Sequence, residues 1–519
     1  MLQESRGVAV KERKRATDTL EDKAADTEAS LYTHGDVPAS RAQLPVPAPL
    51  SRARRAWALF AILCMTFMET LDGTIVNVAL PTMQRELGVG GTEIQLVSSV
   101  FLVVTCAFLL VFGRLGDMLG KVRVFQVGVV LFCVGSAACA LSSTLSALVI
   151  ARAIQALGVA CSLANNQGII TELFAKTRGR ALGLVATFTA LGAMAGPTIG
   201  GVLVSLFPWE SIFVINLPIG IISFVIGVVA LPNRRPQRRV QFDVAGAVLI
   251  VPAILLIFAA ITLMETAVEA SSVGMLVAGV VLLGAFVVVE RRQTEPLVHL
   301  EIFRNVSFDI DLAAMVLVFL GLSGVTIIMP FYLQDALGLE PGLAGLVMAC
   351  YPLVNATIGT LSGALSDRIG CIKPTLAGQV VFMLGILGLS TLALDTPIAR
   401  IVPMLMFTSL GSAMFQSPNN SLIMGHAAPE MLGFVGSLGN LMRYFGQSLG
   451  TTISIGVLYG TMSAEAGTRV TSFVEGQPEL FMHGLAMVFY LLAGLVAVAL
   501  AMSLVRTLVL DRRKRRARA

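Results

Sequence analysis

The sequence predicts an all-α, polytopic membrane protein with fourteen membrane-spanning helices and both termini in the cytoplasm. The chain has 519 residues, of which 55% are hydrophobic and 13% are charged, whereas soluble domains usually carry about 25% charged residues. A helix needs about 20 apolar residues to cross a bilayer, so the apolar residues suffice for about fourteen crossings. This composition argues against a soluble multidomain enzyme.

The first 56 residues predict a disordered cytoplasmic tail. They are polar, mixed in charge and without a hydrophobic period, so they cannot bury enough apolar surface to fold. The first apolar run begins near Trp57. Because that run is long enough to span a membrane, we expect no cleavable signal peptide before it.

Apolar runs of membrane-spanning length follow one another along the rest of the chain. An even number of spans places both termini on one face. The predicted helices are 57–80, 92–112, 122–142, 145–169, 180–205, 212–231, 243–263, 273–290, 308–332, 342–366, 372–393, 399–425, 433–458 and 483–505.

The distribution of basic residues sets the predicted orientation. Loops that stay inside are enriched in lysine and arginine. In this topology the tail up to Arg41 holds seven of the 37 basic residues and the cytoplasmic segments after it hold 25, whereas the outside loops hold three: Arg85, Arg400 and Arg469. The basic run 512–516 is best interpreted as an anchor to anionic lipid rather than a nucleic-acid site.

The helices divide into two six-helix bundles. The predicted domains are a tail at 1–56, an N-terminal bundle at 57–231, a two-helix insert with flanking loops at 232–307, a C-terminal bundle at 308–505 and a basic tail at 506–519. Residues 113–117 (GRLGD) after the second helix are echoed by residues 363–368 (GALSDR) at the equivalent place in the later bundle. Parallel six-helix repeats are typical of transporters that rock between two states.

Ionisable residues inside a membrane are costly and therefore indicate function. Asp72 on the first helix is roughly 13 Å from the outer end, and Arg152 on the fourth helix is roughly 10 Å from the same end. The matched depth predicts an ion pair. Protonating or displacing either partner changes the cost of burying the other, which is the basis of a proton-coupled switch. A static structural ion pair is the alternative.

Two further ionisable residues fall within predicted helices. Glu69 lies three residues before Asp72, on the same helical face and near the bilayer centre. It is a candidate proton carrier or contact for a cationic substrate, and a neutral, hydrogen-bonded glutamic acid is the alternative. Arg443 is the only cation predicted inside the later bundle. Its partner can be an anion or a backbone carbonyl, and the sequence does not distinguish the two.

Small residues repeat on the fifth predicted helix. They are spaced for close helix packing, with a proline that can kink the helix. The set is Gly192, Gly196, Pro197, Gly200 and Gly201.

Several motifs of the chain resemble those of a known family. Residues 71–81 (LDGTIVNVALP) and 192–201 (GAMAGPTIGG) resemble the helix-one signature and the helix-five antiporter motif of the fourteen-helix drug:proton antiporters of the major facilitator superfamily, the EmrB/QacA-like branch. Residues 209–220 are similar to that branch's entry to helix six, although Glu210 and Ser211 replace the usual Arg-Trp. The similarity extends over about residues 57–510.

Two more motifs fit the resemblance with departures. Residues 113–123 (GRLGDMLGKVR) resemble the cytoplasmic loop motif between helices two and three, with Met118 at a position that is often basic. Residues 152–158 (RAIQALG) resemble the helix-four motif, with Ala156 in place of a glycine, and the retained Arg152 implies a role in proton transfer. Asp117 can cap a helix N-terminus or pair with Arg123 and so hold the two halves together, and an ordinary tight turn is the alternative. Beside the helix-five residues, the candidates for conformational gating are Gly113, Asp117, Gly120, Lys121 and Arg123.

Polar residues in the later bundle are candidates for the substrate path, because a helix broken by proline can expose polar groups to a cavity. Polar interhelical contacts are the alternative for each of them. The candidates are Tyr351, Asn355, Gln416, Asn419, Asn420 and Arg443.

These observations predict a proton-coupled antiporter that exports drugs or small amphiphilic compounds by alternating access. Hydrolase and P-loop motifs are absent from the sequence, so an ion gradient is the expected energy source, with no enzyme activity, cofactor, metal or nucleic-acid partner. The expected partners are a lipophilic small molecule, protons and the lipid bilayer, in a multi-pass protein of the cell membrane, the bacterial inner membrane. A dedicated exporter of one metabolite, antibiotic or lipid-like molecule, and a non-transporting receptor or scaffold, are the alternatives.

Overall fold

The computed structural model describes residues 51–174, 178–232, 243–264, 269–293, 297–427 and 431–510. Within these residues the chain is entirely helical, with no strand. In the described part of the chain, fourteen helices contain fifteen or more residues each. They are α2 (Arg52–Leu87), α4 (Leu96–Leu119), α5 (Lys121–Ala140), α6 (Leu145–Leu173), α7 (Arg178–Leu206), α9 (Asn216–Ala230), α10 (Val244–Met264), α11 (Ala270–Glu290), α12 (Val306–Phe331), α13 (Pro341–Ile369), α14 (Ile372–Leu389), α15 (Ile398–Gly425), α16 (Leu432–Ala466) and α17 (Pro478–Val505).

Short helices extend or connect the long ones. The α-helical turns α3 (Gly91–Ile94) and α8 (Ser211–Val214) precede α4 and α9. The 3₁₀ helix η2 (Leu300–Arg304) leads into α12, and the π-helical turns η3 (Tyr332–Ala336) and η5 (Arg506–Leu510) follow α12 and α17. Thirteen of the long helices, counted with these extensions, are long and apolar enough to cross a membrane. The remaining one, α16, is long enough but carries Arg443 and many small polar residues.

Some helix ends differ from the sequence prediction. Helix α2 begins at Arg52, inside the predicted tail, and the rest of that tail lies outside the described residues. Helix α16 continues to Ala466 and α17 begins at Pro478, so their connection is shorter than the predicted loop 459–482. Helix-forming residues extend α16 beyond its apolar part until Gly467, whose left-handed conformation ends the helix. Pro478 is suited to the first position of α17.

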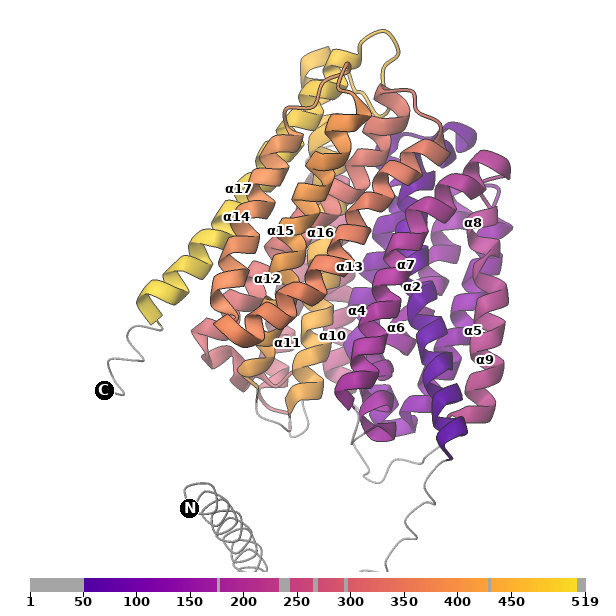
Figure 1. Ribbon diagram of the computed structural model, residues 1–519, viewed down its shortest axis with the longest axis vertical. Helices are drawn as coiled ribbons and strands as arrows, with labels where there is room; N and C mark the ends of the chain where they lie inside the picture. The colour runs from indigo at the N-terminus through magenta and orange to yellow at the C-terminus, as the bar shows by residue number, and fades with distance from the viewer. Residues whose placement is uncertain are drawn as a thin grey trace, which may run out of the picture. The chain divides into compact units, whose positions relative to one another are not determined.

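Two sets of six long helices, which precede and follow α10 and α11, repeat the same packing pairs. We call α2 to α9 the N-half and α12 to α17 the C-half. Within the N-half, α2 packs on α7 and α5 on α6; within the C-half, the equivalent pairs are α12 with α16 and α14 with α15. Figure 1 shows the N-half, in indigo to magenta, beside the C-half, in orange to yellow. The insert helices α10 and α11 pack on each other, and α10 also packs on α4 and α16.

The repeated motif of the two halves forms the same turn in both. Gly120 ends α4 with a φ of 103°, and Gly370 ends α13 with a φ of 84°. These left-handed conformations favour glycine, which has no Cβ. The internal repeat that the sequence indicates is therefore present in the backbone.

Two hydrogen bonds between the halves lie near one end of the bundle. We call the end of the bundle at which α2 and α12 end the upper end, and the opposite end, at which α2 begins and α17 ends, the lower end (Figure 1). Near the upper end, Gln334 Nε2 donates to the carbonyl of Val78 over 2.8 Å, and the amide of Gly91 donates to the carbonyl of Thr471. The halves are thus joined by hydrogen bonds at the upper end.

Candidate functional site

The predicted ion pair between Asp72 and Arg152 is confirmed. Arg152 Nη1 lies 2.5 Å from Asp72 Oδ2, and the exposed fractions of the two side chains are 1% and 0%. The carboxylate comes from α2 and the guanidinium from α6. Because the pair is completely buried, each charge depends on the other and on nearby hydrogen bonds for its stabilisation.

Neighbouring polar groups complete a buried network around this pair. Asp72 Oδ1 accepts hydrogen bonds from Gln155 Nε2 over 2.9 Å and from Asn216 Nδ2 over 2.7 Å. Gln155 also accepts from Arg152 Nη1 over 2.6 Å and donates to Ser136 Oγ over 2.8 Å. Asp72 therefore receives three side-chain donors from two other helices, so any change in its charge alters the hydrogen bonding of α2, α5, α6 and α9 together.

Aromatic rings and a backbone carbonyl hold the guanidinium in place. Arg152 Nε donates to the carbonyl of Val97 over 3.0 Å, and its Cζ lies 4.1 Å from the ring centre of Phe101 and 5.7 Å from that of Phe213. Cation–π contacts of this kind are strongest where water is excluded. The five polar residues of this buried group, Asp72, Ser136, Arg152, Gln155 and Asn216, are called the N-half polar network below.

Glu69 lies one turn from Asp72, closer to the lower end. Ser162 Oγ donates to Glu69 Oε1, and the side chain is 7% exposed. The Glu69 carboxyl is also close enough to Tyr444 of α16 to interact electrostatically with it. Glu69 therefore faces α6 of the N-half, with a hydroxyl as its hydrogen-bond partner.

The glycine-rich stretch of α7 packs directly on the segment of α2 that carries both carboxyl groups. A Cβ at Gly192 would lie 2.5 Å from the carbonyl of Phe67, and a Cβ at Gly200 would lie 2.6 Å from Ile75 Cγ1. Gly196 packs on Thr74, and Pro197 contacts Gly345 of α13. The stretch thus connects Asp72 and Glu69 to the C-half.

Gly201 of α7 packs closely on the start of α13. A Cβ there would lie 2.6 Å from the carbonyl of Pro341, so Gly201→Ala is expected to push the two helices apart. Overpacking costs about 1–3 kcal/mol in the conformation whose upper end is closed. The equilibrium constant between the closed and the open conformation would therefore shift towards the open one by about 5–150-fold. The readout is cysteine labelling of the upper-end contact in membranes.

Gly494→Ala in α17 is the matched control, because nothing lies within 4 Å of a Cβ at Gly494. It should leave the labelling unchanged. Equal labelling of Gly201→Ala and wild type would show that this contact does not control closure.

The loop motif between α4 and α5 forms contacts within the N-half. Lys121 Nζ lies 3.5 Å from Asp117 and 2.8 Å from Glu172 of α6. Asp117 lies in the last turn of α4 and the N-cap of α5 is Gly120, so of the alternatives for Asp117 the capping of α5 is not seen among the described residues. Gly113 lies near Ala164 of α6. Arg123 lies in the first turn of α5.

The predicted substrate residues do not form one cluster. Tyr351 and Asn355 of α13 both donate to Ser412 Oγ of α15 over 3.1 Å, which corresponds to an interhelical contact. Asn419 donates to the carbonyl of Asp311 on α12. Gln416 is half-buried and Asn420 is exposed.

Arg443 contacts an aromatic ring. Its guanidinium lies 5.4 Å from the ring centre of Phe319, and its buried Nε has no hydrogen-bond partner in the described part of the chain. It is next to Tyr444, the residue that Glu69 approaches. Arg443 therefore remains a candidate for contact with a bound molecule.

A second buried ion cluster lies at the lower end of the C-half. Arg506 Nη1 donates to Asp311 Oδ1, and His426 Nε2 lies 3.2 Å from Asp311 Oδ2. Arg506 is 5% exposed, so the prediction that Arg443 is the only buried cation of this half is wrong. Arg506 immediately follows the last apolar run, and no sequence pattern pairs it with Asp311, 195 residues earlier.

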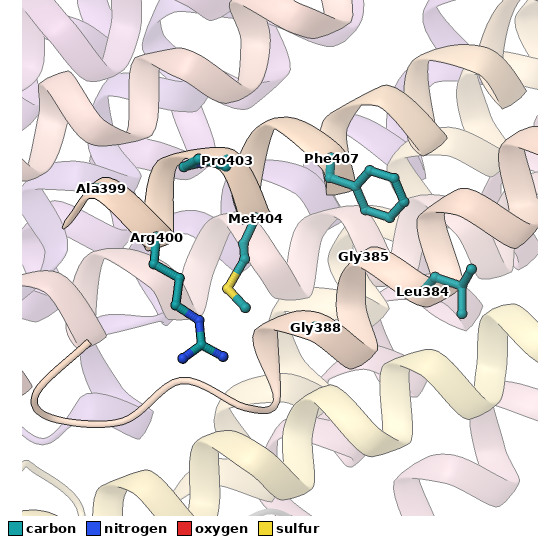
Figure 2. A pocket seen from close by; sticks show the side chains of 8 residues that line it. All are labelled: Leu384, Gly385, Gly388, Ala399, Arg400, Pro403, Met404 and Phe407. Carbon is teal, nitrogen blue, oxygen red and sulfur yellow. The ribbon is translucent and has the colours of Figure 1, made fainter. Parts of the chain in front are cut away.

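A surface groove lies between α14 and α15, away from the N-half polar network. Arg400, Met404 and Phe407 line one side of it, and Leu384, Gly385 and Gly388 line the other (Figure 2). The groove contains none of the residues predicted to bind substrate.

Curated relatives and solved structures agree with this architecture. The chain is 33% identical over 405 residues to the riboflavin transporter RibZ of Clostridioides difficile, covering 77% of this chain and 87% of that protein. It is 32% identical over 435 residues to the tetracenomycin C resistance and export protein of Streptomyces glaucescens, covering 83% and 80%. The multidrug resistance protein Stp of Mycobacterium tuberculosis is 31% identical over 402 residues, covering 77% and 75%.

Two solved structures share the fold at low sequence identity. A bacterial homologue of the human lysosomal transporter Spinster, in an inward-facing conformation, aligns with a TM-score of 0.61 and 15% identity over 88% of this chain and 97% of its own. A peptide transporter, POT, aligns with a TM-score of 0.63 and 16% identity over 86% and 94%. The Major Facilitator Superfamily model matches residues 62–451. The chain therefore belongs to the Major Facilitator Superfamily of membrane transporters.

Proposed function

We propose that this transporter is a proton-coupled antiporter of the fourteen-helix drug-export branch, which exports drugs or small amphiphilic compounds from the cytoplasm. The observation that carries the proposal is the fully buried pair of Asp72 and Arg152 within a polar network of four helices. A buried charge network is costly, and its retention in an apolar bundle favours a functional role. The glycine stretch of α7 packs on the same segment of α2 and offers a route from the network to the C-half.

Protonation of Asp72 is the proposed switch. Neutral Asp72 no longer compensates Arg152, so the guanidinium must find other partners and the packing of α2 on α6 and α9 changes. Glu69, on the same face of α2, is proposed to contact the substrate or to bind a second proton, within electrostatic range of Tyr444. Protonation of Asp72 and binding of a cationic substrate near Glu69 then exclude each other, which produces exchange.

The lower end is proposed to face the cytoplasm. Basic residues gather there, at the start of α2 and in the loops after α4 and α13, whereas the upper-end loops contain few. Hydrogen bonds join the halves at the upper end, so the conformation described corresponds to one closed to the outside. The loop motif around Asp117 and Lys121 would then be cytoplasmic and act in gating. The basic residues 512–516 lie outside the described part of the chain.

An exporter dedicated to one compound is the second candidate. Curated relatives with 32% and 33% identity are named after a single compound, tetracenomycin C or riboflavin, whereas others are named as multidrug proteins. A receptor or scaffold without transport is the least supported alternative, because the costly buried pair of Asp72 and Arg152 is retained.

Everted membrane vesicles with an imposed pH gradient provide the test. A mixed library of lipophilic cations, anions and neutral compounds is added, and accumulated compounds are read by mass spectrometry against vesicles without the protein. Gradient-dependent accumulation of several unrelated compounds supports multidrug export, and accumulation of a single class supports the dedicated exporter. No gradient-dependent accumulation of any compound would overturn the antiporter proposal.

A further inference from the structure

The two-helix insert contains two buried carboxyl groups that face each other. Asp243 immediately precedes α10 and Glu290 is the last residue of α11, and their exposed fractions are 5% and 2%. Asp243 Oδ1 accepts hydrogen bonds from the amide of Gly246 over 2.9 Å and from Gln293 Nε2 over 3.0 Å. Glu290 Oε1 accepts from the amide of Val298 over 2.5 Å. One oxygen of each carboxyl group is thus satisfied by the protein.

The other oxygen of each group has no donor. Asp243 Oδ2 and Glu290 Oε2 are buried and have no hydrogen-bond partner among the described residues. Both oxygens lie against the Cα of Gly246. A Cβ added to this glycine would overlap Asp243 Oδ2 and would lie 3.0 Å from Glu290 Oε2, so the two oxygens are close to each other. The two side chains also interact with each other. Ionised carboxylates can only accept hydrogen bonds, so two ionised groups here would place like charges in contact without water or a donor.

Among the described residues, no cationic side chain forms an ion pair with Asp243 or Glu290. On the segment after α11, Arg291, Arg292 and His299 are exposed, as is Glu301 of η2. On α16, which packs on α10, Arg443 lies over Phe319. Lower-end charges of α4 are Arg114 and Asp117, and Asp117 pairs with Lys121. Within the described part of the chain, the titratable group that acts on Glu290 is Asp243, beside the amides of Leu297 and Val298.

We propose that Asp243 and Glu290 together bind one proton, with the hydroxyl of one carboxyl group donating to the facing oxygen of the other. This proton site is separate from Asp72 and does not depend on the proposed transport function. A shared proton supplies the missing donor and leaves one negative charge, which the amides of Gly246 and Val298 and the amide group of Gln293 stabilise.

The proton site fastens the insert to the segment that leads into the C-half. Val298, whose amide donates to Glu290, packs with Leu297 and Ile302 in the same apolar cluster as Phe308 of α12. Loss of the proton would force the two carboxylates apart and would displace Glu290 from Val298. The site therefore links proton binding at the lower end to the position of the chain entering α12.

Glu290→Gln tests the proposal because the amide imitates the protonated state. Its Oε1 can still accept from Val298, and its Nε2 can donate to Asp243 Oδ2 without a titrating proton. The full-length protein is unfolded in mixed micelles of rising SDS content between pH 5 and pH 9. The folded wild type holds one proton more than the free carboxyl groups do, so its unfolding constant relative to that of Glu290→Gln is expected to rise by up to about tenfold per pH unit.

Asp243→Asn is the second variant, since its amide can donate to Glu290 in the same way, and it should also lose this pH dependence. Glu301→Gln, an exposed carboxyl group on η2, is the matched control and should behave as wild type. Equal pH dependence of Glu290→Gln and wild type would overturn the proposal. So would the failure of both amide variants to fold, or a wild type stabilised at constant pH by added Na⁺ or K⁺, which would indicate two ionised carboxylates around a cation.

Discussion

Replacement of Arg152 by alanine is expected to cause a large loss of stability. The substitution leaves the Asp72 carboxylate buried at 0% exposure with hydrogen-bond donors but no cation. Removing one partner of a buried ion pair costs about 3–5 kcal/mol, because the remaining charge has no compensation. The loss also removes the packing of the guanidinium on Phe101 and Phe213. Thermal unfolding of the purified protein in lipid nanodiscs measures the effect.

The double variant Asp72→Asn with Arg152→Met separates charge from packing. It removes both charges and keeps an apolar side chain of similar length, so it should be clearly more stable than Arg152→Ala. Arg400→Ala is the control for loss of an exposed arginine and should unfold at the wild-type temperature. If Arg152→Ala unfolded at the same temperature as Arg400→Ala, the ion pair of Asp72 and Arg152 would not contribute to the stability of the folded protein.

Asp72→Asn is expected to abolish transport driven by a pH gradient. The amide oxygen can still accept from Gln155 and Asn216, so most of the hydrogen bonds to this position are kept. The side chain can no longer gain or lose a proton, so a proton gradient cannot change its charge. Accumulation in everted vesicles should fall to the level of vesicles without the protein, whereas exchange of labelled for unlabelled substrate at equal pH should continue.

Asp395→Asn is the matched control, because this aspartate is exposed in the upper-end turn between α14 and α15. It should transport as the wild type does. Full gradient-driven accumulation by Asp72→Asn would show that proton coupling does not require Asp72. Glu69 would then be the next residue to replace.

The pairing of Asp72 with Arg152 could be predicted from sequence because depth in a membrane helix follows from counting residues. A rise of about 1.5 Å per residue places both groups at similar distances from one end, and an apolar surrounding leaves few other partners. The internal repeat was also readable, since the turn after α4 and the turn after α13 both need glycine. Membership of a transporter family followed from several motifs along the chain.

The companions of the pair could not be predicted in the same way. Ser136, Gln155 and Asn216 are single polar residues in apolar helices, and which of them meet depends on how α5, α6 and α9 are rotated against α2. A usable signal was present for Gln155, which follows Arg152 by three residues and so shares its helical face.

The ion pair of Asp311 with Arg506 and the carboxyl pair of Asp243 with Glu290 also required the structure. Their members are 195 and 47 residues apart in the chain. They lie at helix ends, where a charged residue normally reaches water or lipid head groups and predicts nothing about its partner. Capping of α5 by Asp117, one of the alternatives for this residue, is not seen among the described residues for a related reason, because Lys121 is close enough to take the carboxylate as its own partner.

Substrate-evoked proton flux in proteoliposomes is the most direct test of coupling through Asp72. The liposomes contain a trapped pH-sensitive dye and no imposed gradient, and a substrate identified in the vesicle screen is added outside. The wild type should move protons opposite to the substrate, and Asp72→Asn should bind and exchange the substrate without any proton movement. Proton movement of equal size in Asp72→Asn would contradict the account.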